Sequence, residues 1–183
     1  LAAGYLRQGD DDHGTPAAVP AITGTPAASS PGQASSAPAL TGFSPVVCDH
    51  KPPANAPRTP QPGAKREVNG WALLPGYSYF ADPNGFHIGV PDGWTYERIG
   101  TTVCFRDPDN VRILSIDHGR NPAGDPVAAC RREATRLVEA GALPKYQAVG
   151  IDRVPMLNKA ADWEYRYSGA NDVRMHAVTR WFA

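Results

Sequence analysis

The chain has 183 residues, with 18 acidic and 18 basic residues and a formal net charge of zero. Binding to nucleic-acid phosphates requires a basic surface, and the sequence has no Lys/Arg cluster to supply one, so we expect no nucleic-acid partner. Proline is unevenly distributed, because 11 of the 19 prolines lie at or before Pro62. The part that can bury a core is therefore about 110 residues long, enough for one small domain.

The chain begins with a short apolar segment, residues 1–6, followed by Arg7 and then by three aspartates. A membrane-spanning helix needs about 20 apolar residues, so this segment alone is too short to cross a bilayer. We interpret residues 1–13 as a membrane-proximal stub, formed by the end of a membrane helix or of a signal peptide. A disordered or tagged terminus is the alternative.

Residues 14–67 are dominated by Pro, Ala, Ser, Thr and Gly. This composition buries too little apolar surface to offset the entropy of ordering, and it favours local polyproline II conformation. We therefore predict a disordered linker, which suits a tether between a surface and a domain. Its Thr-Pro and Ser-Pro pairs could also be phosphorylation sites, and its Pro-Pro pair a ligand for proline-binding modules, but such signals are common in tracts of this kind.

The three cysteines, Cys48, Cys104 and Cys130, permit one disulfide in any of three pairings and leave one thiol. No pair has the close spacing of a zinc knuckle or of a redox CxxC motif. We expect Cys104 and Cys130 to be small buried residues, and a bridge to form if the domain is extracytoplasmic.

Residues 68–183 form the predicted α+β domain. The sequence Asp-Pro-Asn-Gly at 82–85 has the chemistry of a tight turn. Strands are predicted after it at 86–90, 101–106 and 111–117, with a further extended piece that starts at Trp94. Asp125 is the predicted N-cap of a helix that has Pro126 as its first residue and Gly141 after its end. The charged residues at 131–139 are interpreted as its solvated face.

Residues 160–167 read AADWEYRY, in which apolar and charged residues alternate. Successive side chains of a strand point to opposite faces, so this pattern predicts a half-buried strand with Trp163, Tyr165 and Tyr167 on the core face. This strand is predicted to pair with the strand at 146–154 through a turn at 156–159. A last strand at 173–183 stops before any polar ending, so we expect the domain to be truncated at its C-terminus.

We find no set of residues with a pattern typical of catalysis. His87, His118 and His176 lie on separate predicted strands or at their ends, and we interpret them as exposed strand histidines. The sequence has no GxSxG, GxGxxG or GxxxxGK[ST] motif. We therefore predict no catalytic residue, no metal ligand and no cofactor.

Four aromatic residues near the start of the domain are the candidate ligand contacts, namely Trp71, Tyr77, Tyr79 and Trp94. They could line a groove, although aromatic residues near strand ends more often close a core.

The string ADPNGFHIGVPDGW, followed by FRDPD, a helix and AADWEYRY, resembles the C-terminal extracytoplasmic domains of actinobacterial membrane serine/threonine protein kinases. In that family a kinase domain is followed by one membrane helix, a Pro/Ala/Ser-rich tether and the outer domain. The resemblance covers residues 73–183. It implies a PsbP/Mog1-like α/β/α sandwich in which helix covers an antiparallel sheet, and it carries over no catalytic residue. The sequence departs from the family by ending where a further strand is expected.

Three functions remain open. The first is a non-catalytic extracytoplasmic sensor or interaction domain, held at the cell membrane by a serine/threonine kinase whose catalytic part is not in this chain. It would bind an extracellular ligand or protein and could dimerise. The second is a secreted or lipid-anchored PsbP-like binding protein. The third is a small hydrolase, which would require His118 and His176 to converge on an acidic residue.

Overall fold

A computed structural model describes residues 2–8, 45–120, 124–155 and 159–182, and for residues 2–8, 45 and 46 it describes the backbone alone. The strands are β1 (Ala2–Gln8), β2 (Glu67–Val68), β3 (Trp71–Ala72), β4 (Tyr77–Ala81), β5 (His87–Pro91), β6 (Thr95–Ile99), β7 (Thr102–Arg106), β8 (Arg112–Asp117), β9 (Gln147–Val154), β10 (Ala160–Ser168) and β11 (Arg174–Phe182). The helices are α1 (Pro126–Glu139) and the short 3-10 turns η1 (Pro45–Cys48) and η2 (Ala170–Asp172).

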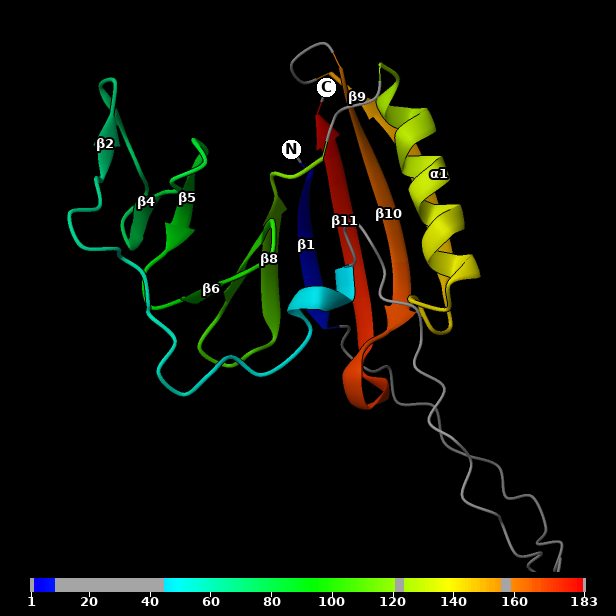
Figure 1. Cartoon of the computed structure of the whole chain (residues 1–183). Helices are drawn as coiled ribbons and strands as arrows, with labels where there is room; N and C mark the ends of the chain where they lie inside the picture. The colour runs from blue at the N-terminus through cyan, green and yellow to red at the C-terminus, as the bar shows by residue number, and fades with distance from the viewer. Residues whose placement is uncertain (1, 9–44, 121–123, 156–158, 183) are drawn as a thin grey trace, which may run out of the picture.

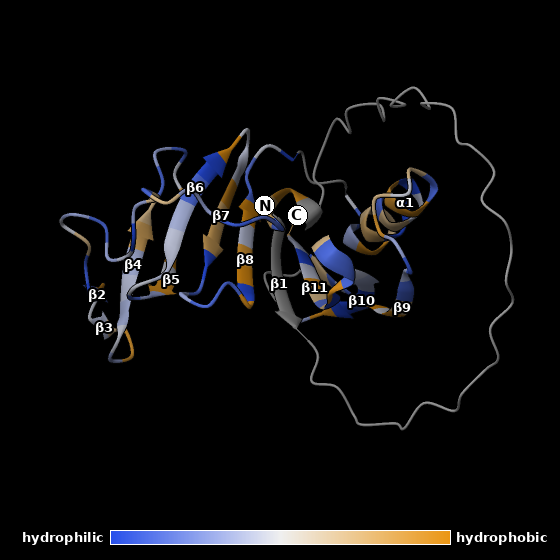
Figure 2. Ribbon diagram, turned by 90° about the horizontal axis from the view of Figure 1, so that it is seen from below, coloured by the Kyte–Doolittle hydropathy of each residue, from blue (hydrophilic) through white to orange (hydrophobic). Residues whose placement is uncertain are grey.

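An antiparallel sheet of seven strands organises the described residues, in the order β6-β7-β8-β1-β11-β10-β9 (Figure 1). Two smaller antiparallel pairs, β2-β3 and β4-β5, accompany it. Helix α1 lies over β9, β10 and β11, whereas β4 and β5 lie beyond the opposite end of the sheet (Figure 2).

The predicted α/β/α sandwich, with helix covering the sheet, is wrong. Within the described ranges, α1 is the single α-helix, and its 14 residues pack mainly against the β9-β10-β11 part of the sheet. The physical reason is that the sheet is much wider than one helix. Strands lie about 4.8 Å apart, so seven of them span about 30 Å, while one helix is only about 10 Å across.

Two apolar cores form on opposite faces of the sheet. The first contains Trp163, Tyr165 and Tyr167 of β10, with side chains of α1 and Cys104 of β7. The second lies between β4-β5 and β6-β7-β8 and contains seven buried residues, namely Phe80, Phe86, Val90, Trp94, Val103, Phe105 and Ile116. Strand β7 contributes to both cores, because its successive side chains point to opposite faces.

Several local predictions are confirmed. The three aromatic residues of the predicted 160–167 strand are buried on β10. Asp125 caps α1, because its Oδ1 accepts a hydrogen bond from the Val127 N–H over 3.0 Å. Gly141 follows the helix end with a φ of +67°, a conformation that favours glycine. At the turn of residues 82–85, the Gly85 N–H donates to the Asp82 carbonyl over 2.9 Å.

The predicted solvated face of the helix is wrong at Glu133. Its side chain is buried and accepts hydrogen bonds from Arg120 Nη2 at 2.8 Å and from Arg136 Nη2 at 2.7 Å. Arg120 in turn donates to the buried Asp117 over 3.0 Å and lies over the ring of Trp181. The charge of Glu133 is therefore compensated inside the structure, as burial of a charge requires.

The N-terminal half enters the fold at two places. Residues 2–8, within the predicted stub, form β1, which pairs with β8 on one side and β11 on the other (Figure 1). Leu1, residues 9–44 of the stub and linker, and residues 156–158 of the predicted turn lie outside the described residues. The division of the chain into stub, linker and domain stays a prediction.

Residues 45–67 differ from the disorder that their composition predicts. Cys48 forms a disulfide with Cys104 of β7, with the two Cα atoms 5.5 Å apart. Further on, the buried Thr59 donates its N–H to the Trp94 carbonyl over 2.8 Å, and Arg58 forms a β-bridge with Thr95. The segment around Thr59 therefore pairs with the outer edge of β6, which would otherwise present unpaired backbone groups.

Candidate ligand-binding site

The four predicted aromatic contacts lie in different environments. Trp71 on β3 is 78% exposed, Tyr77 on β4 is 37% exposed, and Tyr79 on the same strand is half-buried. Trp94 is buried in the second core. The cavities described below are lined by other residues, so the aromatic groove stays a prediction.

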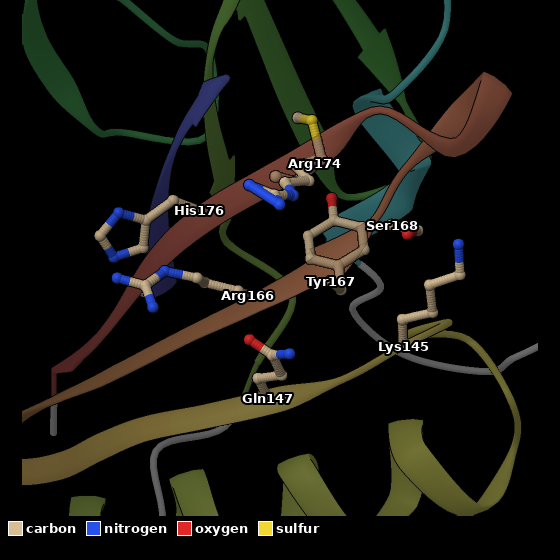
Figure 3. Close-up of a pocket in the computed structure, with 8 residues that line it drawn as sticks. Lys145, Gln147, Arg166, Tyr167, Ser168, Arg174 and His176 are labelled. Carbon is tan, nitrogen blue, oxygen red and sulfur yellow. The ribbon is translucent and has the colours of Figure 1, made fainter. Parts of the chain in front are cut away.

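A cavity of about 450 Å³ lies at one end of β9, β10 and β11 (Figure 3). Its lining is rich in basic and polar side chains and consists of Lys145, Gln147, Arg166, Tyr167, Ser168, Arg174, Met175 and His176. We call it the basic cavity. No acidic residue belongs to its lining.

The register of three strands brings these side chains together. Arg166 of β10 is paired with Gln147 of β9 on one side and with His176 of β11 on the other. Ser168 is paired with Arg174. Lys145 joins them from the loop between α1 and β9. The cavity therefore depends on strand pairing between residues that are far apart in the sequence.

Two basic side chains of the cavity have carboxylate partners next to it. Lys145 Nζ donates to both carboxylate oxygens of Asp172, at 2.6 and 2.7 Å. His176 Nε2 lies 2.6 Å from Glu164 Oε1. The pKa of Asp172 is lowered, mainly by the hydrogen bond from Lys145 and also by one from Ser168.

Arg166 differs from Lys145 and His176 in that it makes no hydrogen bond or ion pair with any described residue. It is exposed, between the buried Tyr165 and Tyr167 in sequence. Its position on β10 follows from strand alternation, which turns every second side chain away from the α1 side. A guanidinium without a carboxylate partner can bind an oxyanion with two parallel hydrogen bonds.

Tyr167 contributes a buried hydroxyl that has no hydrogen-bond partner among the described residues. Burial raises its pKa above the ordinary tyrosine value, and Tyr165 and Asp49 add to the shift, so the phenol is neutral at physiological pH. An unsatisfied buried hydroxyl costs about 1–3 kcal/mol. A ligand or a water molecule that reaches it would recover part of this cost.

A second cavity, of about 430 Å³, lies between residues 53–61 and strands β4, β6 and β7. Phe80, Tyr96 and Val103 give it apolar walls, and Arg98 pairs with the buried carboxylate of Asp82 beside them. Burial by itself would raise the pKa of Asp82, but hydrogen bonds from Asn84 and Arg98 outweigh burial and lower it. Because of these apolar walls, this cavity suits an apolar ligand better than an ionic one.

The histidines do not converge. His118 follows β8 and contacts Asn84 and Arg98, each over 3.1 Å, whereas His176 contacts Glu164. Strand register places them at opposite ends of the sheet, since β1 pairs Ala2 with Asp117 but Arg7 with His176. The convergence that the hydrolase hypothesis needs is therefore not found. His87 is exposed on β5.

The described residues offer neither a group of metal ligands nor a helix that could cross a membrane. In the ranges 2–8, 45–120, 124–155 and 159–182, no group of three or more His, Cys, Asp or Glu side chains could hold a metal ion. Among the helices of these same ranges, none combines the length and the apolar character that crossing a membrane requires.

The described residues form a β-rich domain that has ligand-sized cavities, and among these residues no catalytic set is assembled. A family profile described as serine/threonine kinase C-terminal domain matches residues 78–183. The match spans more than half of the chain, so the chain belongs to this family. It confirms the kinase part of the resemblance, and it does not show similarity to PsbP or Mog1 proteins. Comparisons with curated proteins and with solved structures found no match.

Proposed function

We propose that the chain is the non-catalytic, extracytoplasmic sensor or interaction domain of a membrane-anchored serine/threonine protein kinase. Family membership supports the attachment to a kinase. The extracytoplasmic location is supported by one observation above all, the Cys48–Cys104 disulfide.

The disulfide supports an oxidising compartment because such bonds persist outside the cytoplasm and are rare within it. Cys48 and Cys104 are both fully buried, and the bridge links two positions that are 56 residues apart in the sequence. The third cysteine does not compete for pairing. Cys130 is buried on α1, and burial, aided by the charge of Asp162, raises the pKa of its thiol to about 12.

A sensor must bind its ligand with different affinity in two states, since only such a difference shifts an equilibrium. The two cavities offer places where a ligand could do this. The basic cavity lies across three strands, and the second cavity is closed on one side by residues 53–61, the segment that leads into the domain. Ligand binding would then change the association or the orientation of domains attached to the kinase.

The location can be tested with the full-length kinase in protoplasts of the native host. Protease added outside is expected to remove this domain from intact protoplasts, and rapid alkylation before lysis is expected to trap Cys48 and Cys104 as a disulfide. A domain that is protected until lysis and that has reduced cysteines would overturn the proposal.

The same disulfide also fits a secreted or lipid-anchored binding protein. The two functions differ in whether the domain is part of the same polypeptide as a kinase domain. If the domain is recovered from the medium, or in the membrane as a polypeptide without a kinase domain, the receptor-kinase function is wrong and the binding-protein function replaces it.

A further inference from the structure

We infer that the basic cavity binds a small molecule that carries two or more carboxylate or phosphate groups. The inference deepens the proposed function and rests on it, because it names the class of ligand that the domain would sense. It is carried by the arrangement of basic residues around the cavity.

Three basic residues of the cavity lie close together on two paired strands. Arg166 of β10 is opposite His176 of β11, and Arg174 of β11 is opposite Ser168, two residues after Arg166. Strand register therefore gathers these basic residues at one end of the sheet.

Two basic residues of the cavity are paired with carboxylates, since His176 contacts Glu164 and Lys145 contacts Asp172. The guanidinium of Arg166 has no carboxylate partner among the described residues, and the lining of the cavity holds no acidic residue. Arg166 is therefore the cation best placed to bind an anionic group.

Lys145 provides a second argument, from its backbone. Its φ is +54°, a left-handed conformation that few residues other than Gly, Asn and Asp adopt. The other non-glycine residues with positive φ in the described ranges are Asn69, Asn110, Asn171 and Asp172. A lysine at such a position is unfavourable for the backbone, and strain of this kind is often found at functional sites.

The size of the cavity favours a ligand larger than a single phosphate. Its volume of about 450 Å³ lies within the range of small-molecule sites. Arg166 and Lys145 are supplied by β10 and by the loop before β9, so separate anionic groups of one ligand can meet separate cations. Ser168 and Gln147 add neutral groups for hydrogen bonding. The formal net charge of zero disfavours a long polyanion such as nucleic acid.

The test is isothermal titration calorimetry on the 183-residue chain at low ionic strength, with pyrophosphate and citrate as probes and acetate as the monovalent comparison. Saturable binding of pyrophosphate or citrate to one site per chain, much tighter than that of acetate, is expected. Arg166→Gln should weaken binding by about tenfold. The control Lys65→Gln removes one positive charge from an exposed position outside the basic cavity and should leave binding unchanged.

Each result of the titration leads to a different conclusion about the ligand. Preference for pyrophosphate assigns the site to phosphorylated ligands, and preference for citrate assigns it to polycarboxylates. Absence of saturable binding, or equal losses in Arg166→Gln and Lys65→Gln, would overturn the inference. Such a failure leaves the disulfide and the protease test of location untouched. Conversely, tight binding by a domain that proves to be cytoplasmic would overturn the proposed function and retain the anion site.

Discussion

Arg106 of β7 donates a hydrogen bond from Nε to the backbone carbonyl oxygen of Cys48, over 2.8 Å, although 58 residues separate them. The Arg106 side chain is fully buried, and its Nη2 also donates to Glu97 Oε1 over 2.8 Å. Cys48 is bonded in turn to Cys104, two residues before Arg106 on the same strand. The segment before the family-matched region is thus fixed to β7 by a covalent bond and by a charged side chain.

The disulfide is expected to stabilise the folded chain strongly. The double variant Cys48→Ala, Cys104→Ala should lower the free energy of unfolding by about 2–4 kcal/mol, because the unfolded chain gains conformational freedom. Urea denaturation with and without dithiothreitol measures this. The wild-type chain and the control Cys130→Ala should both lose stability with the reductant, and the double variant should not respond. A wild-type chain that is insensitive to reductant would contradict the prediction.

The pair between Arg106 and Glu97 is expected to be costly to break. Glu97→Gln leaves a buried guanidinium with less compensation, so unfolding should become easier by about 2–4 kcal/mol, below the full cost of a buried pair because the Glu97 side chain is 16% exposed. The exposed Glu67→Gln serves as control and should change stability by at most about 0.5 kcal/mol.

A double variant distinguishes the effect of the buried charge on stability from the effect of changing the side-chain shape at Glu97. Adding Arg106→Met to Glu97→Gln removes the uncompensated charge and should restore part of the lost stability. If the double variant is destabilised by the sum of the two single changes, the pair does not interact as described.

Lys145→Asn should separate ligand binding from stability. Asparagine tolerates the left-handed backbone better than lysine, and the exposed pair with Asp172 contributes little to stability. The free energy of unfolding should therefore stay within about 1 kcal/mol of wild type, while pyrophosphate binding should weaken about fivefold. Calorimetric titration and urea denaturation provide the two measurements, with the exposed Lys65→Asn as control. A joint loss of stability and binding would indicate a purely structural role.

Acid sensitivity is expected to depend on Asp82. Its pKa is lower in the folded chain, because the hydrogen bonds from Asn84 and Arg98 exceed the opposing effect of burial. A carboxyl group of this kind stabilises the fold above its unfolded pKa of about 3.9, and the stabilisation is lost as the pH falls through the folded value.

This pH dependence can be measured by urea denaturation between neutral pH and pH 3. Asp82→Asn should be less stable than wild type by about 1–3 kcal/mol at pH 7 and should lose less stability on acidification. Asp109→Asn, in an exposed turn, is the control variant. Parallel pH curves for wild type and Asp82→Asn would contradict the prediction.

Local patterns in the sequence were enough to predict some features of this chain. The alternation at 160–167 predicted which side of β10 is buried, and Asp125 with Gly141 predicted the bounds of α1. These features depend on residues within one or two turns of each other or on neighbours along one strand. Their physical causes, capping and side-chain alternation, are already present in a short peptide segment.

Tertiary structure decided the features that depend on distant residues. The composition of residues 45–67 predicted disorder, yet Cys48 and Thr59 are held by partners on β7 and before β6. The extent of helix cover depended on the width of the assembled sheet. The basic cavity arises because strand register places Arg166 beside His176, and the charged alternation of β10 was its only local signal. Such contacts depend on the free energy of pairing between segments that are far apart in the sequence. A pattern among neighbouring residues gives no information about that free energy.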